Sequence, residues 1–313
     1  MKIEDIKIDL TPQEVNEQSW NKEQWIKDNP VNYFKFLRVL QLTNNGLVIN
    51  EIMKTVYRIT RLYLPNILYK YYSLSNDHEL NEKKFDTLLN KRIFMSDLKD
   101  FNDPFDGKGY FYLSEELAKI DQLKQCNGKI IDDFSSFTKC TSLTSNGINS
   151  MPMWAHYGSN HTGFCVSYDM NDKENIDLIS NSFPVQYIDE RIDITSMMKD
   201  YMSKICNQIA SQDSLEGNKI IIDDLSLVYM SILFTNLKHQ TWSYENEFRC
   251  IIGSNAPGVP FINAKPKEIF IGMNCDFDST TKLKSIANHL GAEAYKMTFD
   301  EYNESYNLIP VLL

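Results

Sequence analysis

The chain alternates between short β-type runs and longer helical segments, and this alternation restricts the fold more than any other feature. Runs such as NILYKYYSL at 66–74 and KEIFIGM at 267–273 are rich in aromatic and β-branched residues and are flanked by polar or turn-forming residues, as strands are. Segments with apolar residues at three- and four-residue spacing lie between them. Short strands with helices inserted between them predict an α+β fold with a mixed, largely antiparallel sheet.

The helical pattern is concentrated in two regions of the chain. Residues 1–65 predict an N-terminal helical layer, because INEIMKTVYRITRLYL at 49–64 places its apolar residues on one helical face before Pro65 ends it. Residues 66–313 then predict one α+β domain, with a helical insertion at about 190–240. A further helix is predicted over residues 109–133.

Charge and segment composition exclude several classes of protein. With 32 basic against 42 acidic residues, the formal charge of −10 opposes a general nucleic-acid-coating surface. The N-terminus MKIEDIKIDLTPQEV lacks the features of a secretory signal, and no run approaches the length of a membrane span, so we expect a cytoplasmic protein without membrane contact. The six cysteines form no C-x-x-C pair, which favours reduced thiols.

The segment YENEFRCII at 244–252 alternates charged and apolar residues with the period of a β-strand. On such a strand Glu245, Glu247 and Arg249 share one face, while the apolar residues between them face the core. The charged face either lines a cleft or is a solvent-exposed set of ion pairs, each worth 0 to about 1 kcal/mol. We expect it to face the other polar clusters of the chain rather than water.

One of those clusters is the turn-rich loop FNDPFDG at 101–107. Asn102, Asp103 and Asp106 either contact a substrate, or bind a hard cation through their oxygens, or only shape the turn. Substrate contact is the hypothesis that we carry forward, and no metal is expected.

A second cluster is MWAHYGSNHTGF at 153–164. Trp154 and Tyr157 offer aromatic faces for a nicotinamide or adenine ring, and His156 can act as an acid or base near neutral pH. Alternatively, the aromatic residues fix a short helix to the core. Trp242, just before the charged strand, is likewise either a core residue or a substrate contact.

Five motifs in a fixed order resemble a bacterial family catalogued as domain of unknown function number 2971. They are LYKYYSL, RIFMSDLKDFNDPFDG, MPMWAHYGSNHTGFCVSYD, W-x-x-E-x-E-F-R and KEIFIG, and they cover about residues 67–273. This resemblance implies a domain boundary rather than a mechanism.

The order of motifs is also similar to that of ADP-ribosyltransferases, which use split mixed sheets. In that family an early strand carries His or Arg, a middle strand Tyr or a Ser/Thr pattern, and a late strand a catalytic Glu. Here LYKYYSL looks like the early strand, with Lys70 or Tyr71 at the position of the His or Arg. SSFTKCTS looks like the middle strand, with Ser136, Thr138, Thr141 and Ser142, and Glu247 lies on the late strand.

The resemblance implies NAD as a substrate and a split sheet. A carboxylate such as Glu247 against the ribose 2′-hydroxyl would stabilise the positive charge that develops on the sugar, Glu245 would accept a proton, and Arg249 would offset the repulsion between the two acids. His156 is a third catalytic candidate. The nucleotide would contact Lys70, Tyr71, Ser136, Thr138, Trp154, Tyr157 and Arg249, and the substrate-binding candidates are Asn102, Asp103, Asp106 and Trp242.

Three functions follow as hypotheses. The first is an NAD-consuming ADP-ribosyltransferase-like enzyme, in a bacterial effector or antiviral defence protein, with a protein or nucleic-acid acceptor. The second is a non-catalytic module that binds a nucleotide or a partner. The third is a metal-dependent nuclease that uses Asp103 or Asp106 with Glu247, against which the acidic charge and the lack of an E-x-K pattern argue.

Overall fold

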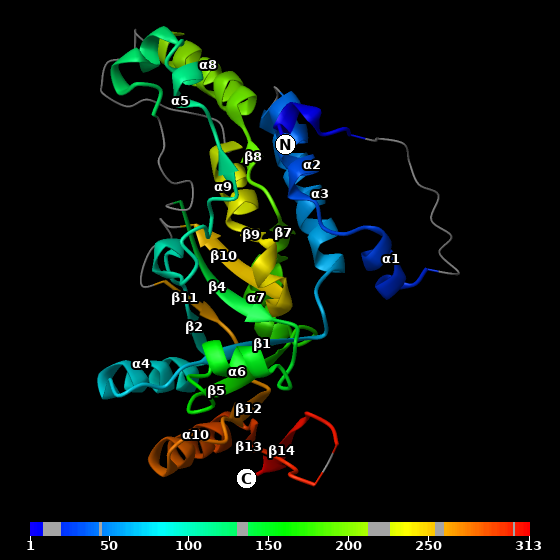
Figure 1. Cartoon of the computed structure of the whole chain (residues 1–313), viewed down its shortest axis with the longest axis vertical. Helices are drawn as coiled ribbons and strands as arrows, with labels where there is room; N and C mark the ends of the chain where they lie inside the picture. The colour runs from blue at the N-terminus through cyan, green and yellow to red at the C-terminus, as the bar shows by residue number, and fades with distance from the viewer. Residues whose placement is uncertain (9–19, 44–45, 130–136, 212–225, 254–259, 303) are drawn as a thin grey trace.

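A mixed sheet forms the centre of the computed structural model, which describes residues 1–8, 20–43, 46–129, 137–211, 226–253, 260–302 and 304–313 (Figure 1). Its order within these residues is β14-β13-β12-β5-β1-β4-β10-β6, and neighbouring strands are antiparallel except for the parallel pair β12 and β13. This confirms the predicted α+β class. The strands are β1 (Ile67–Tyr72), β4 (Thr138–Thr144), β5 (Phe164–Asp169), β6 (Ser182–Pro184), β10 (Glu247–Gly253), β12 (Glu268–Ile271), β13 (Glu293–Phe299) and β14 (Leu308–Leu312).

The sheet diverges in the middle, between β1 and β4. β1 pairs with β5 from Ile67 to Tyr72, and β4 pairs with β10 from Thr138 to Thr144. In contrast, β1 and β4 meet only where Tyr69 pairs with Thr144. The two halves of the sheet are therefore joined at one point and separate from there, as a split sheet requires.

Helices cover both faces of the larger half of the sheet, which runs from β14 to β1, and a further helix contacts the smaller half. α4 (His78–Leu89) and α10 (Phe277–Leu290) pack on one face, where Phe85 and Leu283 share a buried cluster with Leu68. α6 (Met151–His156) packs on the other face, where the Trp154 ring meets Tyr71 edge-on. α7 (Ile176–Asn181) contacts β10.

The N-terminal helices and the helical insertion form one body beside the sheet (Figure 1). α1 (Lys22–Asp28), α2 (Tyr33–Leu42) and α3 (Gly46–Leu62) precede the sheet, while α8 (Thr195–Ser211) and α9 (Ser226–Thr235) come from the insertion. Leu37 of α2, Met198 of α8 and Leu233 of α9 share one buried cluster. The helical pattern ends at the predicted boundary, between α3 and β1, but the division into separate domains stays a prediction.

The predicted helix over residues 109–133 is wrong, because the described part of this segment is broken. It contains β3 (Tyr110–Phe111), α5 (Ser114–Leu117) and η4 (Asp121–Cys126), and Asn127 and Gly128 then adopt left-handed backbone conformations that end the last turn. The other short elements are η1 (Ile3–Asp5), β2 (Arg92–Phe94), η3 (Leu98–Asp100), η6 (Lys173–Asn175), β7 (Gln186–Ile188), β8 (Ile192–Asp193), β9 (Leu237–His239), η7 (Gln240–Glu245) and β11 (Phe261–Asn263). No helix among the described residues has the length and apolar character that crossing a membrane requires.

Candidate functional site

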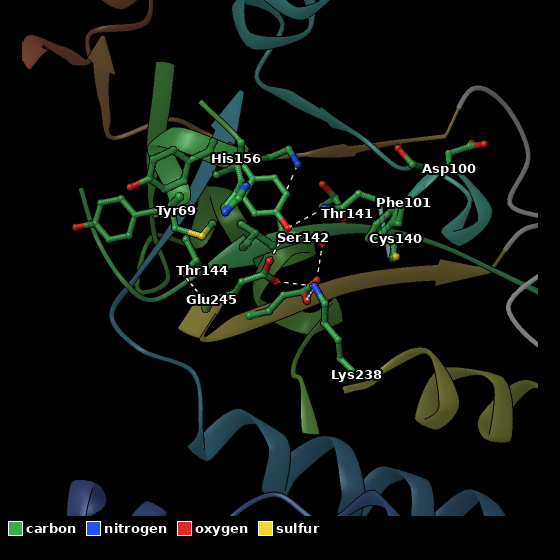
Figure 2. A pocket seen from close by; sticks show the side chains of 18 residues that line it. Tyr69, Asp100, Phe101, Cys140, Thr141, Ser142, Thr144, His156, Lys238 and Glu245 are labelled. Carbon is green, nitrogen blue, oxygen red and sulfur yellow. Dashed lines mark hydrogen bonds and ion pairs between the residues drawn. The ribbon is translucent and has the colours of Figure 1, made fainter. Parts of the chain in front are cut away.

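A cavity of about 330 Å³ opens where β1 and β4 diverge. This volume lies within the range of small-molecule sites. Figure 2 shows the Glu245, Lys238 and Ser142 side chains near its centre, with Tyr69 on one side and Phe101 on the other. The lining residues come from β1 (Tyr69, Lys70, Tyr71), β4 (Cys140, Thr141, Ser142, Leu143, Thr144), the region from Ser96 to Asn102 (Ser96, Asp100, Phe101, Asn102), the α6 region (Met153, His156, Tyr157) and the segment from β9 to β10 (Lys238, Glu245, Glu247).

Glu247 is a buried carboxylate at the floor of this cavity, only 3% exposed. Its Oε1 accepts hydrogen bonds from Ser142 Oγ at 2.5 Å and Arg249 Nε at 2.8 Å, and its Oε2 accepts from Lys238 Nζ at 2.9 Å and Arg249 Nη2 at 3.1 Å. Burial opposes its ionisation, but Arg249 and Lys238 outweigh burial and hold its pKa at about 2. Four donors fill the acceptor positions of this carboxylate.

Glu245 also lines this cavity, but it lies outside β10. It is the last residue of η7, and Asn246 then turns the chain with a φ of 44° before β10 starts at Glu247. The prediction that both acids lie on one strand is therefore wrong. Glu245 nevertheless is only 3% exposed and lines the cavity, so both acids face the cleft rather than water.

The hydrogen bonds of Glu245 leave it spare acceptor capacity. Lys238 Nζ donates to its Oε2 at 2.6 Å, and the Tyr157 hydroxyl donates to its Oε1. Burial and the nearby charge of Glu247 raise the pKa of Glu245, and Lys238 offsets this only in part. Glu245 and Glu247 thus have pKa values shifted in opposite directions.

Lys238 joins the two acids and was not predicted from the sequence. It lies on β9, it is 3% exposed, and its ammonium contacts both carboxylates. Burial opposes its charge, but Glu247, Asp106 and Glu245 together raise its pKa. Nothing in the segment NLKHQTW distinguishes this lysine from a surface residue, because the acids that fix it are brought together only by the fold.

Arg249 and Asp106 lie behind the cavity rather than on its wall. Arg249 is fully buried, its Nη2 donates to Asp106 Oδ1 at 2.5 Å, and its Nη1 donates to the Thr235 carbonyl oxygen at 2.5 Å. Burial raises the pKa of Asp106, and Arg249 opposes the rise. This pair therefore holds Glu247 in place. Arg249 was predicted to contact the nucleotide and Asp106 the substrate, but neither residue lines the cavity.

Several other predicted residues do line the cavity. Asn102 Nδ2 lies 3.4 Å from Tyr157 Oη, to which it donates, and His156 lies on the adjoining wall. On β1, Tyr71 donates its hydroxyl to the Gly147 carbonyl oxygen, and Lys70 Nζ donates to the Ser142 carbonyl oxygen at 3.3 Å. The loop, α6 and β1 clusters thus meet the two acids in one place.

The two predicted tryptophan contacts lie elsewhere. Trp154 is fully buried, and its indole donates to the Ile148 carbonyl oxygen at 2.8 Å, so it is a core residue of α6. The Trp242 ring lies 5.0 Å from Lys238 Nζ, outside the cavity lining, where it contacts the buried ammonium.

The other residues that were predicted to contact the nucleotide or the substrate do not line the cavity either, as far as the structure describes them. Thr138 lies at the far end of β4 with its hydroxyl 3.0 Å from that of Thr235. Asp103 Oδ1 accepts from the Phe105 backbone N–H at 2.9 Å, which shapes the turn. Ser136 lies outside the described residues. On β4 it is instead Thr141 and Ser142, from the same Ser/Thr pattern, that line the cavity.

The donor set does not suit a metal ion. Within the described residues, no three or more His, Cys, Asp and Glu side chains are grouped so that they could hold one. Glu247 and Asp106 each already form an ion pair with Arg249.

Comparison with known proteins identifies one family. No curated protein and no solved structure matches the chain significantly. A family model matches residues 153–250, which include most of α6, all of β9 and the first four residues of β10, and so cover His156, Lys238 and Glu247. This match supports, over this segment, the predicted resemblance to the family described as Protein of unknown function (DUF2971).

Proposed function

We propose that the cavity between β1 and β4 binds NAD and cleaves the bond between nicotinamide and ribose, as an enzyme of the ADP-ribosyltransferase type. One observation carries the proposal: Glu245 and Glu247 share the ammonium of Lys238 beside a cavity, and their pKa values are shifted in opposite directions. Carboxylate pairs that differ in this way divide the roles of acid–base group and fixed anion in glycosyl chemistry.

The chemistry assigns a role to each acid. Loss of nicotinamide leaves positive charge on the ribose, which a permanently ionised carboxylate stabilises electrostatically. Glu247 suits this role because its charge is held by Arg249 and Lys238. Glu245 has spare acceptor positions and a raised pKa, so it is the better candidate to accept a proton from the attacking nucleophile.

The placement of the strands adds support. The early, middle and late strands that resemble those of ADP-ribosyltransferases are β1, β4 and β10. All three contribute to one cavity, through Lys70, Ser142 and Glu247 respectively. The cavity also lies at the divergence of the sheet, and a split sheet is what the resemblance implies.

The proposal is tested by incubating the full chain with NAD and measuring free nicotinamide. Glu245→Gln keeps the shape of the side chain and removes the proton acceptor, so we expect turnover to fall by a factor of about 10² to 10⁴. Glu268→Gln is the control, because it makes the same substitution at a hydrogen-bonded glutamate, which accepts from Ser167 Oγ at 2.7 Å, but Glu268 is not part of the cavity lining. Equal nicotinamide release by wild type and Glu245→Gln, with both folded, would refute the assignment.

A second candidate function is nucleotide binding without turnover. The four donors on Glu247 leave no acceptor position for a ribose hydroxyl unless one of them moves. Calorimetric binding of NAD without nicotinamide release would favour this alternative. The nuclease hypothesis gains no support, because two of its three acids, Asp106 and Glu247, are paired with Arg249. The protein or nucleic-acid acceptor stays a prediction, and so does the role in defence.

A further inference from the structure

Two lysines line the same cavity in opposite electrostatic surroundings. Lys238 contacts two carboxylates at 2.6 and 2.9 Å. Lys70, on β1, forms no ion pair with any carboxylate in the described part of the chain, and its ammonium donates to the Ser142 carbonyl oxygen at 3.3 Å. One lysine of the pair is therefore fixed as a cation, and the other is not.

The position of Lys70 follows from the split in the sheet. One residue before it, Tyr69 makes the single register contact with β4; beyond that point the strands separate, and the Lys70 side chain lies in the gap. Burial makes the charged form costly there and lowers the pKa of Lys70 to about 8. A substantial fraction of this amine is thus neutral near physiological pH, whereas a surface lysine is almost entirely protonated.

We propose that Lys70 is a nucleophilic amine that forms an imine with the aldehyde of a small open-chain sugar bound in this cavity. The proposal does not depend on NAD cleavage. Desolvated lysines that lack a carboxylate partner are the ones that proteins use as amine nucleophiles toward carbonyl compounds.

The reaction balances without an oxidant or reductant. The neutral Nζ attacks the carbonyl carbon, a C–N bond forms, and one proton moves from nitrogen to the carbonyl oxygen to give a carbinolamine. A second proton leaves the nitrogen as the hydroxyl departs with a proton as water, which leaves a C=N bond. Glu245, whose pKa is raised, lines the same cavity and can supply and take back the proton that this dehydration needs.

The lining of the cavity favours a sugar over an apolar aldehyde. Asn102, Ser142 and Tyr157 offer amide and hydroxyl groups for hydrogen bonds with sugar hydroxyls. Tyr69 and Phe101 supply aromatic surface on opposite sides, as Figure 2 shows. The volume of about 330 Å³ admits a small sugar.

D-glyceraldehyde, the smallest aldose, is the probe for the test. The full chain is incubated with it and sodium cyanoborohydride, which reduces imines to stable amines, and the modified lysines are identified by peptide mass spectrometry. At pH 7.5 we expect Lys70 to be labelled at least about tenfold faster than Lys99, an exposed lysine, because far more of the Lys70 amine is neutral. The rate at Lys70 should level off above a midpoint near pH 8, while labelling of surface lysines continues to rise.

Lys238 is the internal control, because it lines the same cavity but is held as a cation. It should stay unlabelled while Lys70 reacts, and Lys70→Arg should remove the label from the cavity. Labelling of Lys70 no faster than Lys99, or labelling of Lys238 as fast as Lys70, would overturn the proposal. Wild-type protein suffices for both comparisons, and neither outcome depends on whether NAD is cleaved.

Discussion

At the scale of single residues, the side chain of Glu247 is buried and yet ionised, because its partners come from three different strands. Ser142 lies on β4, Lys238 on β9 and Arg249 on β10. Charged groups out of water cost several kcal/mol each unless they are paired and hydrogen-bonded, so each partner is needed to keep the charge. The Glu247 carboxylate therefore connects β4, β9 and β10 at the floor of the cavity.

The hydrogen bond from Ser142 to Glu247 should stabilise the fold in a pH-dependent way. We expect Ser142→Ala to lower the free energy of unfolding by about 1.5–3 kcal/mol at pH 7, because it removes a bond to a buried charge. The pKa of Glu247 is about 2 in the folded chain, below its ordinary value of 4.5. The stabilisation of the charged form is thus complete above pH 4.5 and is lost as the pH falls through about 2. Urea unfolding of both proteins from pH 7 to about pH 2 measures the difference.

Ser167→Ala provides the control, because Ser167 Oγ donates to the half-buried Glu268 at 2.7 Å, away from the cavity. We expect a smaller loss there than for Ser142→Ala at pH 7, since the partner is not buried in the ion network. A Ser142→Ala effect that stayed constant down to about pH 2, or that merely equalled the control at pH 7, would contradict the role assigned to Glu247.

The sequence alone was sufficient to select Glu245, Glu247 and Arg249, but not Lys238, the cation that joins the two glutamates. Glu245 and Glu247 stand out by their spacing, and Asn102, His156 and Tyr157 by their local clusters. Lys238 has no comparable signal. Its partners Glu245 and Glu247 reach it only through η7 and the turn at Asn246, whose geometry no sequence pattern encodes. Trp154 had two interpretations, and only packing against Tyr71 decided for the core.

At the scale of secondary structure, prediction succeeded where periodicity was strong and failed where turns dominate. The runs at 66–74 and 267–273 became β1 and β12, and the run at 49–64 became most of α3. The segment at 109–133 failed, because Arg191 donates to the Lys108 and Tyr110 carbonyl oxygens and β3 pairs with β8 there. Those contacts are non-local, so they override helix propensity in a way that one segment cannot reveal.

The N-terminus of α10 offers a test of a local capping interaction. Asp276 is the N-cap, and its side chain accepts from the Ser279 backbone N–H at 2.8 Å. Asp276→Ala should lower the free energy of unfolding by about 1 kcal/mol, the usual value of such a cap. Asp278→Ala is the control, because this acid lies in the same first turn but does not cap it, so only the smaller interaction with the helix dipole is lost. Thermal unfolding compares the two, and equal losses would argue against the cap.

At the scale of the whole molecule, the helical body and the sheet are joined by buried polar contacts as well as by packing. The Tyr33 hydroxyl of α2 donates to the Pro184 carbonyl oxygen on β6 at 2.5 Å, and its backbone N–H donates to Gln186 Oε1 at 2.6 Å. Arg61 of α3 donates to the Ile179 and Ser182 carbonyl oxygens. β6 is an edge strand of the sheet, and Tyr33 and Arg61 of the N-terminal helices donate hydrogen bonds to its carbonyl oxygens. We therefore expect β6 to depend on these helices for its stability.

This dependence predicts that damage to the helical body destabilises the sheet. Leu37 of α2 is fully buried in the helical core, so Leu37→Ala should lower the free energy of unfolding by about 2–5 kcal/mol. Leu42→Ala, on the same helix but 58% exposed, should change it by less than about 0.5 kcal/mol. Because the two bodies share contacts at β6, we expect one cooperative transition, in which amides of β4 and β10 lose hydrogen-exchange protection together with those of α2. Retention of wild-type protection in β4 and β10 alone would instead show that the sheet folds as an independent domain.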